Sequence, residues 1–220
     1  MNSYLVSCEN ATCAVPEAHR ELFRGAEEIV TSGEGWEPGS LNLAQGFSMR
    51  LRTPLVHGEV TRLLIDLEEE GPACWSRFSE KLSESTRNRL MDRHHRTYWT
   101  TLEQRILEDL RRHDRVLHLM IHTDEATEGT ILLQTPPGAK QAEAVAESWL
   151  RELRHPELKA VHEKNVKPVP AAAALAGKID NPAYAPVVLR VSQGFFLNGR
   201  PWRWETLKKH LLAALDAAMK

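Results

Sequence analysis

Residues 116–122 read VLHLMIH, an apolar run that is interrupted by one histidine and ends in another. A run of this length and composition is typical of a strand in the interior of a parallel sheet. Before it, residues 99–110 place apolar side chains at the spacing of an amphipathic helix. After it, residues 130–134 read TILLQ and predict a further strand. The centre of the chain therefore indicates a fold in which helices cover a sheet.

The alternation of strands and helices continues outward toward both ends of the chain. We expect a three-layer α/β/α sandwich around a mainly parallel mixed sheet, because such alternation builds parallel sheets that are covered on both faces. Residues 167–185 are rich in Pro and Ala, and only one strand and one helix follow them. This remainder is too short for a second domain, so we expect residues 167–185 to form a long surface loop within a single domain, 1–220. The charged residues 76–93 predict a loop with helical pieces. The remaining predicted strands are residues 4–8, 60–67 and 187–191, and the remaining predicted helices are residues 38–51, 142–153 and 204–218.

The charge balance weakens the case for one broad class of function. The chain has 28 Lys and Arg against 30 Asp and Glu, which leaves a formal net charge of -2. This balance argues against a protein that binds nucleic acid or an anionic membrane through bulk electrostatics. At 220 residues and 42% hydrophobic composition the chain is long enough to bury a sizeable core.

Cysteine usage and the N-terminal sequence bear on the compartment. The three cysteines, Cys8, Cys13 and Cys74, are sparse and odd in number, which argues against a disulfide-stapled secreted fold. The first residues lack a basic segment followed by an apolar one, so we expect no secretory signal. The sequence also lacks an apolar run of roughly 20 residues, the length that a membrane span needs. We therefore expect a cytoplasmic protein.

Polar residues follow the predicted strands, where ligands collect in parallel α/β sheets. Among them, His122 is the strongest single candidate for a metal ligand, because neutral imidazole is a common zinc ligand. The alternative for His122 is a partly buried histidine that is satisfied by the backbone. The run Glu68-Glu69-Glu70 is more typical of a solvated turn than of a metal cage, and the familiar GxGxxG, Walker, HExxH and GxSxG motifs are absent. The strand-end groups are Cys8-Glu9-Asn10, Asp66 to Glu69, His122-Thr123-Asp124, and Arg190 with Ser192 and Gln193.

Six short stretches lie in order along the chain: Ser7-Cys8-Glu9-Asn10 with Val15-Pro16, Gly35 to Ser40, Thr61 to Asp66, Arg96 with Tyr98, His122-Thr123-Asp124, and Arg190 to Phe195. Taken together, they resemble the N-formylglutamate amidohydrolase family. Members of that family typically carry the segments SCEH, GWDPGA, SRLxIDxNR, an R…Y helix, HSFTP and ExRQDL. Order and approximate spacing are similar from Leu5 to about Leu215.

This resemblance implies a fold and an activity. The fold would be the zinc-exopeptidase-like, phosphorylase/hydrolase-like sandwich, in agreement with the order of strands and helices. The activity would be zinc-dependent hydrolysis of the amide bond of a small N-acyl amino acid such as N-formylglutamate. The family's metal positions correspond to Asn10, Glu37 and His122, with Glu9 as a neighbouring replacement ligand. Asn10 replaces a histidine, and its amide oxygen is a poorer zinc ligand than an imidazole nitrogen.

The second departure concerns the residue that accepts a proton. Arg190 stands where the family has a glutamate that resembles a general base, and a guanidinium cannot accept a proton from water. We therefore expect Glu68 or Asp124 to act as base, while Arg190 takes a new part in the catalytic site. Arg62, Arg190 and Gln193 would bind the substrate, since guanidinium groups suit a carboxylate.

An alternative interpretation follows from the same two replacements. The chain would then be a catalytically degenerate or repurposed small-molecule-binding protein on the same fold. In that case Arg190 would pair with Glu37 and fill the place of the metal with a salt bridge.

Overall fold

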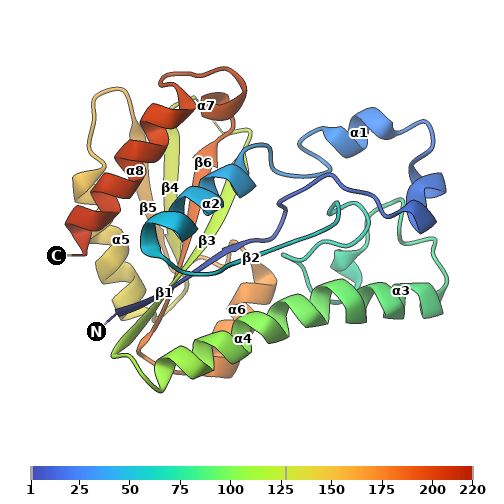
Figure 1. Ribbon diagram of the computed structural model, residues 1–220, viewed down its shortest axis with the longest axis horizontal. Coiled ribbons are helices and arrows are strands. Elements are labelled where there is room, and N and C mark those ends of the chain that lie inside the picture. Colours follow the sequence, from blue (N-terminus) through green and yellow to red (C-terminus); the bar gives the residue numbers. More distant parts are fainter. Residues whose placement is uncertain (1, 127, 220) are drawn as a thin grey trace.

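The computed structural model describes residues 2–126 and 128–219, and its central feature is a six-stranded sheet with helices on both faces (Figure 1). The strands are β1 (Asn2–Cys8), β2 (Leu55–His57), β3 (Arg115–Asp124), β4 (Thr130–Thr135), β5 (Lys159–Lys164) and β6 (Tyr184–Ser192). The α-helices are α1 (Glu27–Thr31), α2 (Ser40–Leu51), α3 (Glu84–Leu90), α4 (Thr97–Leu110), α5 (Lys140–Glu152), α6 (Pro170–Ile179), α7 (Gly194–Leu197) and α8 (Trp204–Ala218). Two short 3-10 helices, η1 (Glu17–Phe23) and η2 (Gly71–Cys74), and a π-helical segment, η3 (Met91–Arg96), complete the elements.

The strand order is β2-β1-β3-β6-β4-β5. The first four strands in this order run parallel, β4 runs antiparallel to β6, and β5 runs parallel to β4. The predicted mainly parallel mixed sheet is therefore confirmed. Because parallel strands end at the same edge of a sheet, the carboxyl ends of β1, β3 and β6 meet there.

Alternating side chains of the strands form two apolar layers. On one face, Leu117 and Leu119 belong to a buried cluster with residues of α2, α5 and α8. On the other face, Val116 and Met120 belong to a second cluster with residues of α4 and α6. This division follows from the period of two in a strand, and each fully buried large aliphatic side chain contributes roughly 1.5–3 kcal/mol. The predicted three-layer sandwich is confirmed, as Figure 1 shows.

The prediction of a strand at residues 60–67 is wrong. This segment consists mostly of turns, and the Thr61 hydroxyl donates to the Gly35 carbonyl at 2.7 Å. Val60 and the apolar residues 63–65 belong to a third cluster that includes Phe23 and Val30, whereas Leu67 belongs to the second cluster. The apolar run therefore reflects burial within an irregular segment, and the strand beside β1 is the three-residue β2.

The prediction of a surface loop at residues 167–185 is also wrong. The segment contains α6, in which Ala171, Ala172 and Leu175 are buried against the sheet. Pro170 stands at the start of this helix, where its missing N–H costs nothing, and alanine has the highest helix propensity. The edge strand β5 was not predicted, because its sequence KAVHEK shows little apolar patterning. By contrast, residues 76–93 do contain helical pieces, α3 and the first part of η3.

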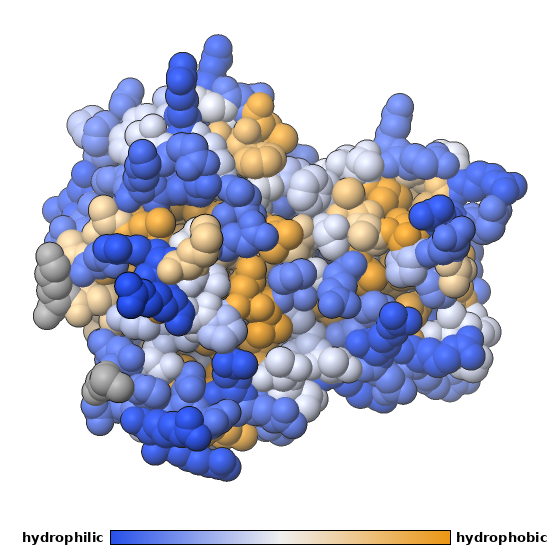
Figure 2. Space-filling view, in the orientation of Figure 1, coloured by the Kyte–Doolittle hydropathy of each residue, from blue (hydrophilic) through white to orange (hydrophobic). Residues whose placement is uncertain are grey.

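Figure 2 shows one face of the molecule, which is largely hydrophilic with smaller apolar areas. None of the helices in the described residues has both the length and the apolar character that crossing a membrane requires.

Candidate metal centre

His122 lies at the carboxyl end of β3, fully buried, with three carboxylates around its ring. Its Nδ1 atom is 3.1 Å from Glu37 Oε2 and 3.3 Å from Glu68 Oε1. On the opposite edge of the ring, Nε2 is 3.1 Å from Glu9 Oε2. The interpretation of His122 as a histidine satisfied only by the backbone does not describe this environment.

The start of α2 positions Glu37. The backbone N–H groups of Glu37 and Thr123 tie the two segments together: the first donates to the Asn10 carbonyl at 3.0 Å and the second to Glu37 Oε2 at 3.1 Å. Gly39 has a φ of 92°, and a Cβ there would lie 2.7 Å from the Phe196 ring. Only glycine therefore fits both this backbone conformation and this contact.

Glu68 follows directly after the irregular residues 60–67, and this part of the chain brings its side chain to His122. Trp99 Nε1 donates to the Leu67 carbonyl at 2.9 Å, and the backbone N–H of Ala171 donates to the Glu68 carbonyl at 3.0 Å. The side-chain amide of Asn10 donates to Glu68 Oε1. The amide of Asn10 is thus bonded to one of the carboxylates around His122.

Two guanidinium groups flank the carboxylates. Arg190 Nη1 lies 3.8 Å from Glu37 Oε1, and its Nη2 lies 3.7 Å from Glu68 Oε2. Arg190 Nε is 3.9 Å from Asp124 Oδ2, and Arg62 Nη1 is 3.9 Å from Glu37 Oε1. These separations exceed those of hydrogen bonds, so the guanidinium groups act on the carboxylates through charge.

Access to this cluster comes from the side of the guanidinium groups. The Glu9, Glu37 and His122 side chains are 0–2% exposed. By contrast, the Arg190 side chain is 16% exposed, that of Arg62 28% and that of Asp124 31%. A ligand approaching from solvent would therefore meet Arg62, Arg190 and Asp124 first.

The charges shift the pKa values of the buried groups. Burial alone would lower the pKa of His122, but Glu37 and Glu68 outweigh it and hold that pKa well above its ordinary value. Burial would raise the pKa of Glu68, yet His122 and Arg190 lower it to about 2. For Glu37 burial prevails and raises the pKa. At neutral pH the ring of His122 is thus protonated and is the positive centre of the cluster.

A divalent cation fits the same donor set. Glu37, Glu68 and His122 each offer a ligand atom, and these atoms all lie within 4.8 Å of one another. The four carboxylates of Glu9, Glu37, Glu68 and Asp124 outnumber the two guanidinium groups, which leaves two negative charges when His122 is neutral. One imidazole with two carboxylates is a donor set that zinc accepts, and its oxygen content also suits harder divalent ions.

The structure brings nearly all the predicted site residues into one cluster. Glu9 contacts the ring edge opposite Glu37 and Glu68, so it is placed behind His122 rather than beside the other two carboxylates. Gln193 is buried, and its side-chain amide lies against the Thr123 carbonyl at 3.5 Å. Sequence reasoning assigned no role to Tyr98 or His118, although a histidine inside the apolar run of β3 was a visible signal.

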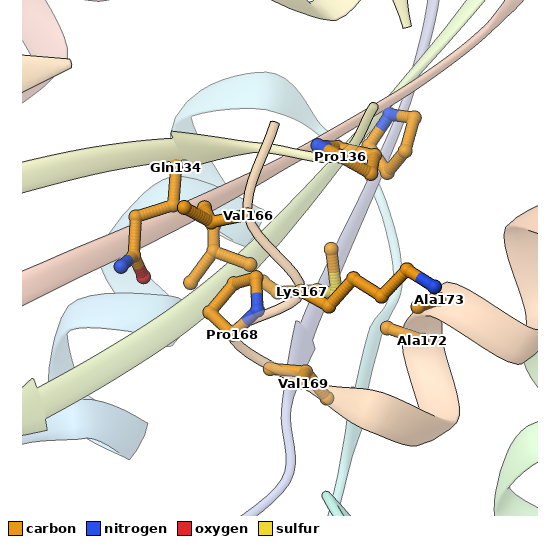
Figure 3. Close-up of a pocket in the computed structure, with 11 residues that line it drawn as sticks. Gln134, Pro136, Val166, Lys167, Pro168, Val169, Ala172 and Ala173 are labelled. Atoms are coloured by element: carbon orange, nitrogen blue, oxygen red, sulfur yellow. The ribbon is translucent and has the colours of Figure 1, made fainter. Parts of the chain in front are cut away.

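An apolar pocket lies apart from the charged cluster. It is lined by residues of β3 and β6, the end of β4, the segment before α6 and the first turn of α6, and it encloses about 20 Å³ (Figure 3). Of its side chains, only Lys167 carries a charge. Its size admits about one water molecule, so it is not a substrate site.

The fold is similar to that of solved structures. A gene product from Agrobacterium tumefaciens superposes with a TM-score of 0.82 at 18% identity, over 99% of this chain and 89% of that one. The N-formylglutamate amidohydrolase from Ralstonia eutropha superposes with a TM-score of 0.65 at 15% identity, over 100% of this chain and 94% of that one. At identities this low, the superpositions establish the fold alone. That fold is the one implied by the motif resemblance.

Neither a protein-family model nor a curated protein sequence matches the chain significantly.

Proposed function

We propose that this chain is a metal-dependent amidohydrolase that cleaves the amide bond of a small N-acyl amino acid, with zinc as its cofactor. The observation that carries this proposal is the convergence of Glu37, Glu68 and His122 Nδ1 at the carboxyl edge of the sheet. The fold shared with an N-formylglutamate amidohydrolase supports it.

Glu37, Glu68 and His122 would hold the cation, with the amide of Asn10 beside them. When bound, zinc polarises an acyl carbonyl and makes a water molecule easier to deprotonate. Glu9 contributes from behind the ring, since a carboxylate against the far nitrogen of a ligating histidine orients it.

Asp124 is the residue we assign as proton acceptor. Arg190 cannot accept a proton, and a carboxylate whose pKa is about 2, such as Glu68, is a weak base. Asp124 lies on the accessible side, with Oδ2 3.9 Å from Arg190 Nε. The Arg190 guanidinium there would hold the Asp124 carboxylate in place.

Arg190 and Arg62 would hold the carboxylate of the substrate. Two hydrogen bonds to the backbone hold the Arg62 side chain in place: Nε donates to the Glu34 carbonyl at 3.0 Å, and Nη2 donates to the Gly33 carbonyl. The third nitrogen, Nη1, remains directed toward Glu37. Gln193 would act by supporting the backbone at Thr123. A guanidinium pair suits a small anionic substrate.

The test is metal analysis coupled with hydrolysis of a panel of N-formyl and N-acetyl amino acids. We expect about one zinc per chain and hydrolysis that His122→Ala and Asp124→Asn abolish. Glu34→Gln is the matched control, because Glu34 is exposed and pairs with Arg77. Protein that takes up no divalent metal after zinc is added would contradict the proposal.

A second candidate is a non-hydrolytic protein that binds small molecules on the same fold. The observation that favours it is the position of Arg190, which holds a positive charge within 3.8 Å of both Glu37 and Glu68. The double variant Arg190→Glu with Asn10→His separates the two candidates. Gain of amidase activity would indicate a degenerate enzyme, whereas loss of an existing activity would show that Arg190 serves the reaction.

The three free cysteines accord with a reducing compartment, and we include the cytoplasm in this proposal as the place of action.

A further inference from the structure

A line of buried polar side chains leads from His122 into the sheet, away from the accessible side. Glu9 Oε1 accepts from the Ser7 hydroxyl at 2.9 Å. Ser7 Oγ is also 2.9 Å from His118 Nε2, and His118 Nδ1 is 2.8 Å from the Tyr184 hydroxyl. All four side chains are buried, so each of these polar groups must find its partner within the protein.

The chemistry of these groups sets the direction of every hydrogen bond. An ionised carboxylate only accepts, so the Ser7 hydroxyl donates to Glu9. The Ser7 oxygen is then free to accept the proton on His118 Nε2, and His118 Nδ1 accepts from Tyr184. Burial lowers the pKa of His118 to about 4, so its ring carries a single proton, as this direction requires.

The same carboxylate meets His122 with its other oxygen. The Tyr98 hydroxyl donates a second hydrogen bond to Glu9 Oε1 at 2.7 Å. Glu9 Oε2 is left facing His122 Nε2 at 3.1 Å. Within the described part of the chain, neither of these two atoms has an aligned hydrogen-bond partner. A slight tilt of the ring would align them, and an unmet buried pair is costly.

We propose that Ser7, His118 and Tyr184, together with Tyr98, are positioning residues that fix Glu9 so that it retains the proton on His122 Nε2. A cation that displaces the other proton, on Nδ1, would then find the Nδ1 lone pair on the side of Glu37 and Glu68, where the proposed function places it. The consequence for metal binding rests on that proposed function, whereas the retained Nε2 proton does not. Such outer partners commonly set metal affinity by 10–100-fold.

The first measurement follows the Nε2 proton directly. In protein with 15N-labelled histidine, we expect a downfield, slowly exchanging proton on His122 Nε2, assigned by its loss in His122→Gln. Ser7→Ala and Tyr98→Phe should speed its exchange about tenfold or more. His118→Gln keeps a donor toward Ser7 and should largely retain the slow exchange. Ser79→Ala is the matched control, because Ser79 is equally buried and its hydroxyl oxygen accepts instead from the Ser76 backbone.

The second measurement is zinc affinity in the same variants. We expect Ser7→Ala and Tyr98→Phe to weaken zinc binding by roughly 10–100-fold and Ser79→Ala to leave it unchanged. Tyr184→Phe, at the far end of the line, gives a third variant if either of the others is poorly folded. Unchanged proton exchange and unchanged affinity in the variants would overturn the inference. A wild-type protein with the slow, variant-sensitive proton but no zinc binding would support the inference and defeat the proposed function.

Discussion

His122 and Arg190 are register partners on the parallel strands β3 and β6. Their side chains therefore leave the sheet side by side, and both reach Glu37: His122 Nδ1 at 3.1 Å and Arg190 Nη1 at 3.8 Å. A proton acceptor in place of Arg190 would share this position. The charge at this register position decides how strongly the carboxylates can attract a cation.

Arg190→Gln should strengthen divalent-metal binding. Arg190 lies some 4 Å from two carboxylates that would hold the cation, so its positive charge repels that cation. Removing the charge relieves a repulsion of a few kcal/mol at an effective dielectric constant of about 20, partly offset by solvent. We expect zinc affinity, measured by competition with a chelator, to rise about tenfold or more. Arg112→Gln is the control, since Arg112 is exposed and pairs with Glu108 on α4. Weaker binding in Arg190→Gln would show that the guanidinium organises the carboxylates instead of competing with the metal.

Zinc binding should release a proton and strengthen as pH rises. The pKa of His122 lies well above its ordinary value because Glu37 and Glu68 outweigh its burial. A cation at Nδ1 must therefore displace a proton, and its affinity increases with pH until the pH exceeds that pKa. Calorimetry in buffers of different ionisation enthalpy should report about one proton released per zinc. Binding without proton release would exclude His122 Nδ1 as a ligand.

Stability should fall on acidification through the protonation of His118. Burial lowers its pKa from 6.5 to about 4, so its contribution is fully present above pH 6.5. As pH falls toward 4 the unfolded chain binds a proton that the folded one does not, and about 3 kcal/mol is lost. His122 acts in the opposite direction, because its pKa is raised in the folded state, so its contribution grows as pH falls through the unfolded value of 6.5; this contribution is common to wild type and His118→Gln. Urea unfolding at about pH 7 and about pH 4.5 should show a smaller difference in His118→Gln than in wild type.

Gly39→Ala should both destabilise the fold and weaken metal binding. At a φ of 92° an alanine is strained, and its Cβ would meet the Phe196 ring at 2.7 Å, next to Glu37. Gly25→Ala is a matched control, because Gly25 has a φ of 76° but open space around it. Strain alone costs roughly 1–2 kcal/mol. We expect thermal unfolding to show a loss of that size in Gly25→Ala and a larger one in Gly39→Ala, which alone should lose zinc affinity.

The parts of the fold that sequence patterns predict are those where burial follows a regular period. The apolar runs of β1, β3 and β6 are covered on both faces and read as continuous hydrophobic strands. Residues 60–67 have the same composition, but an irregular segment buries them through turns, and composition cannot distinguish the two. The exposed edge strand β5 carries too few apolar residues to show a period.

The members of the site were predictable, but their arrangement was not. The motif resemblance pointed to Glu9, Glu37 and His122 on three separate segments. That Glu68 lies beside Asn10 and His122 depends on the path of residues 58–70, which no local pattern encodes. The role of Ser7 and His118 depends on register between β1 and β3, where Leu5 pairs with His118.

The reversed direction of β4 and β5 places one loop at the end of the sheet opposite the charged cluster. Because β4 runs opposite to β6, its carboxyl end leads to residues 136–140, which lie beside Tyr184 at the start of β6. That turn therefore sits at the edge away from His122, and Gly138 within it has open space around it. It offers an attachment point for a fluorophore or an affinity tag, through which the protein can be immobilised or observed while the charged cluster remains free.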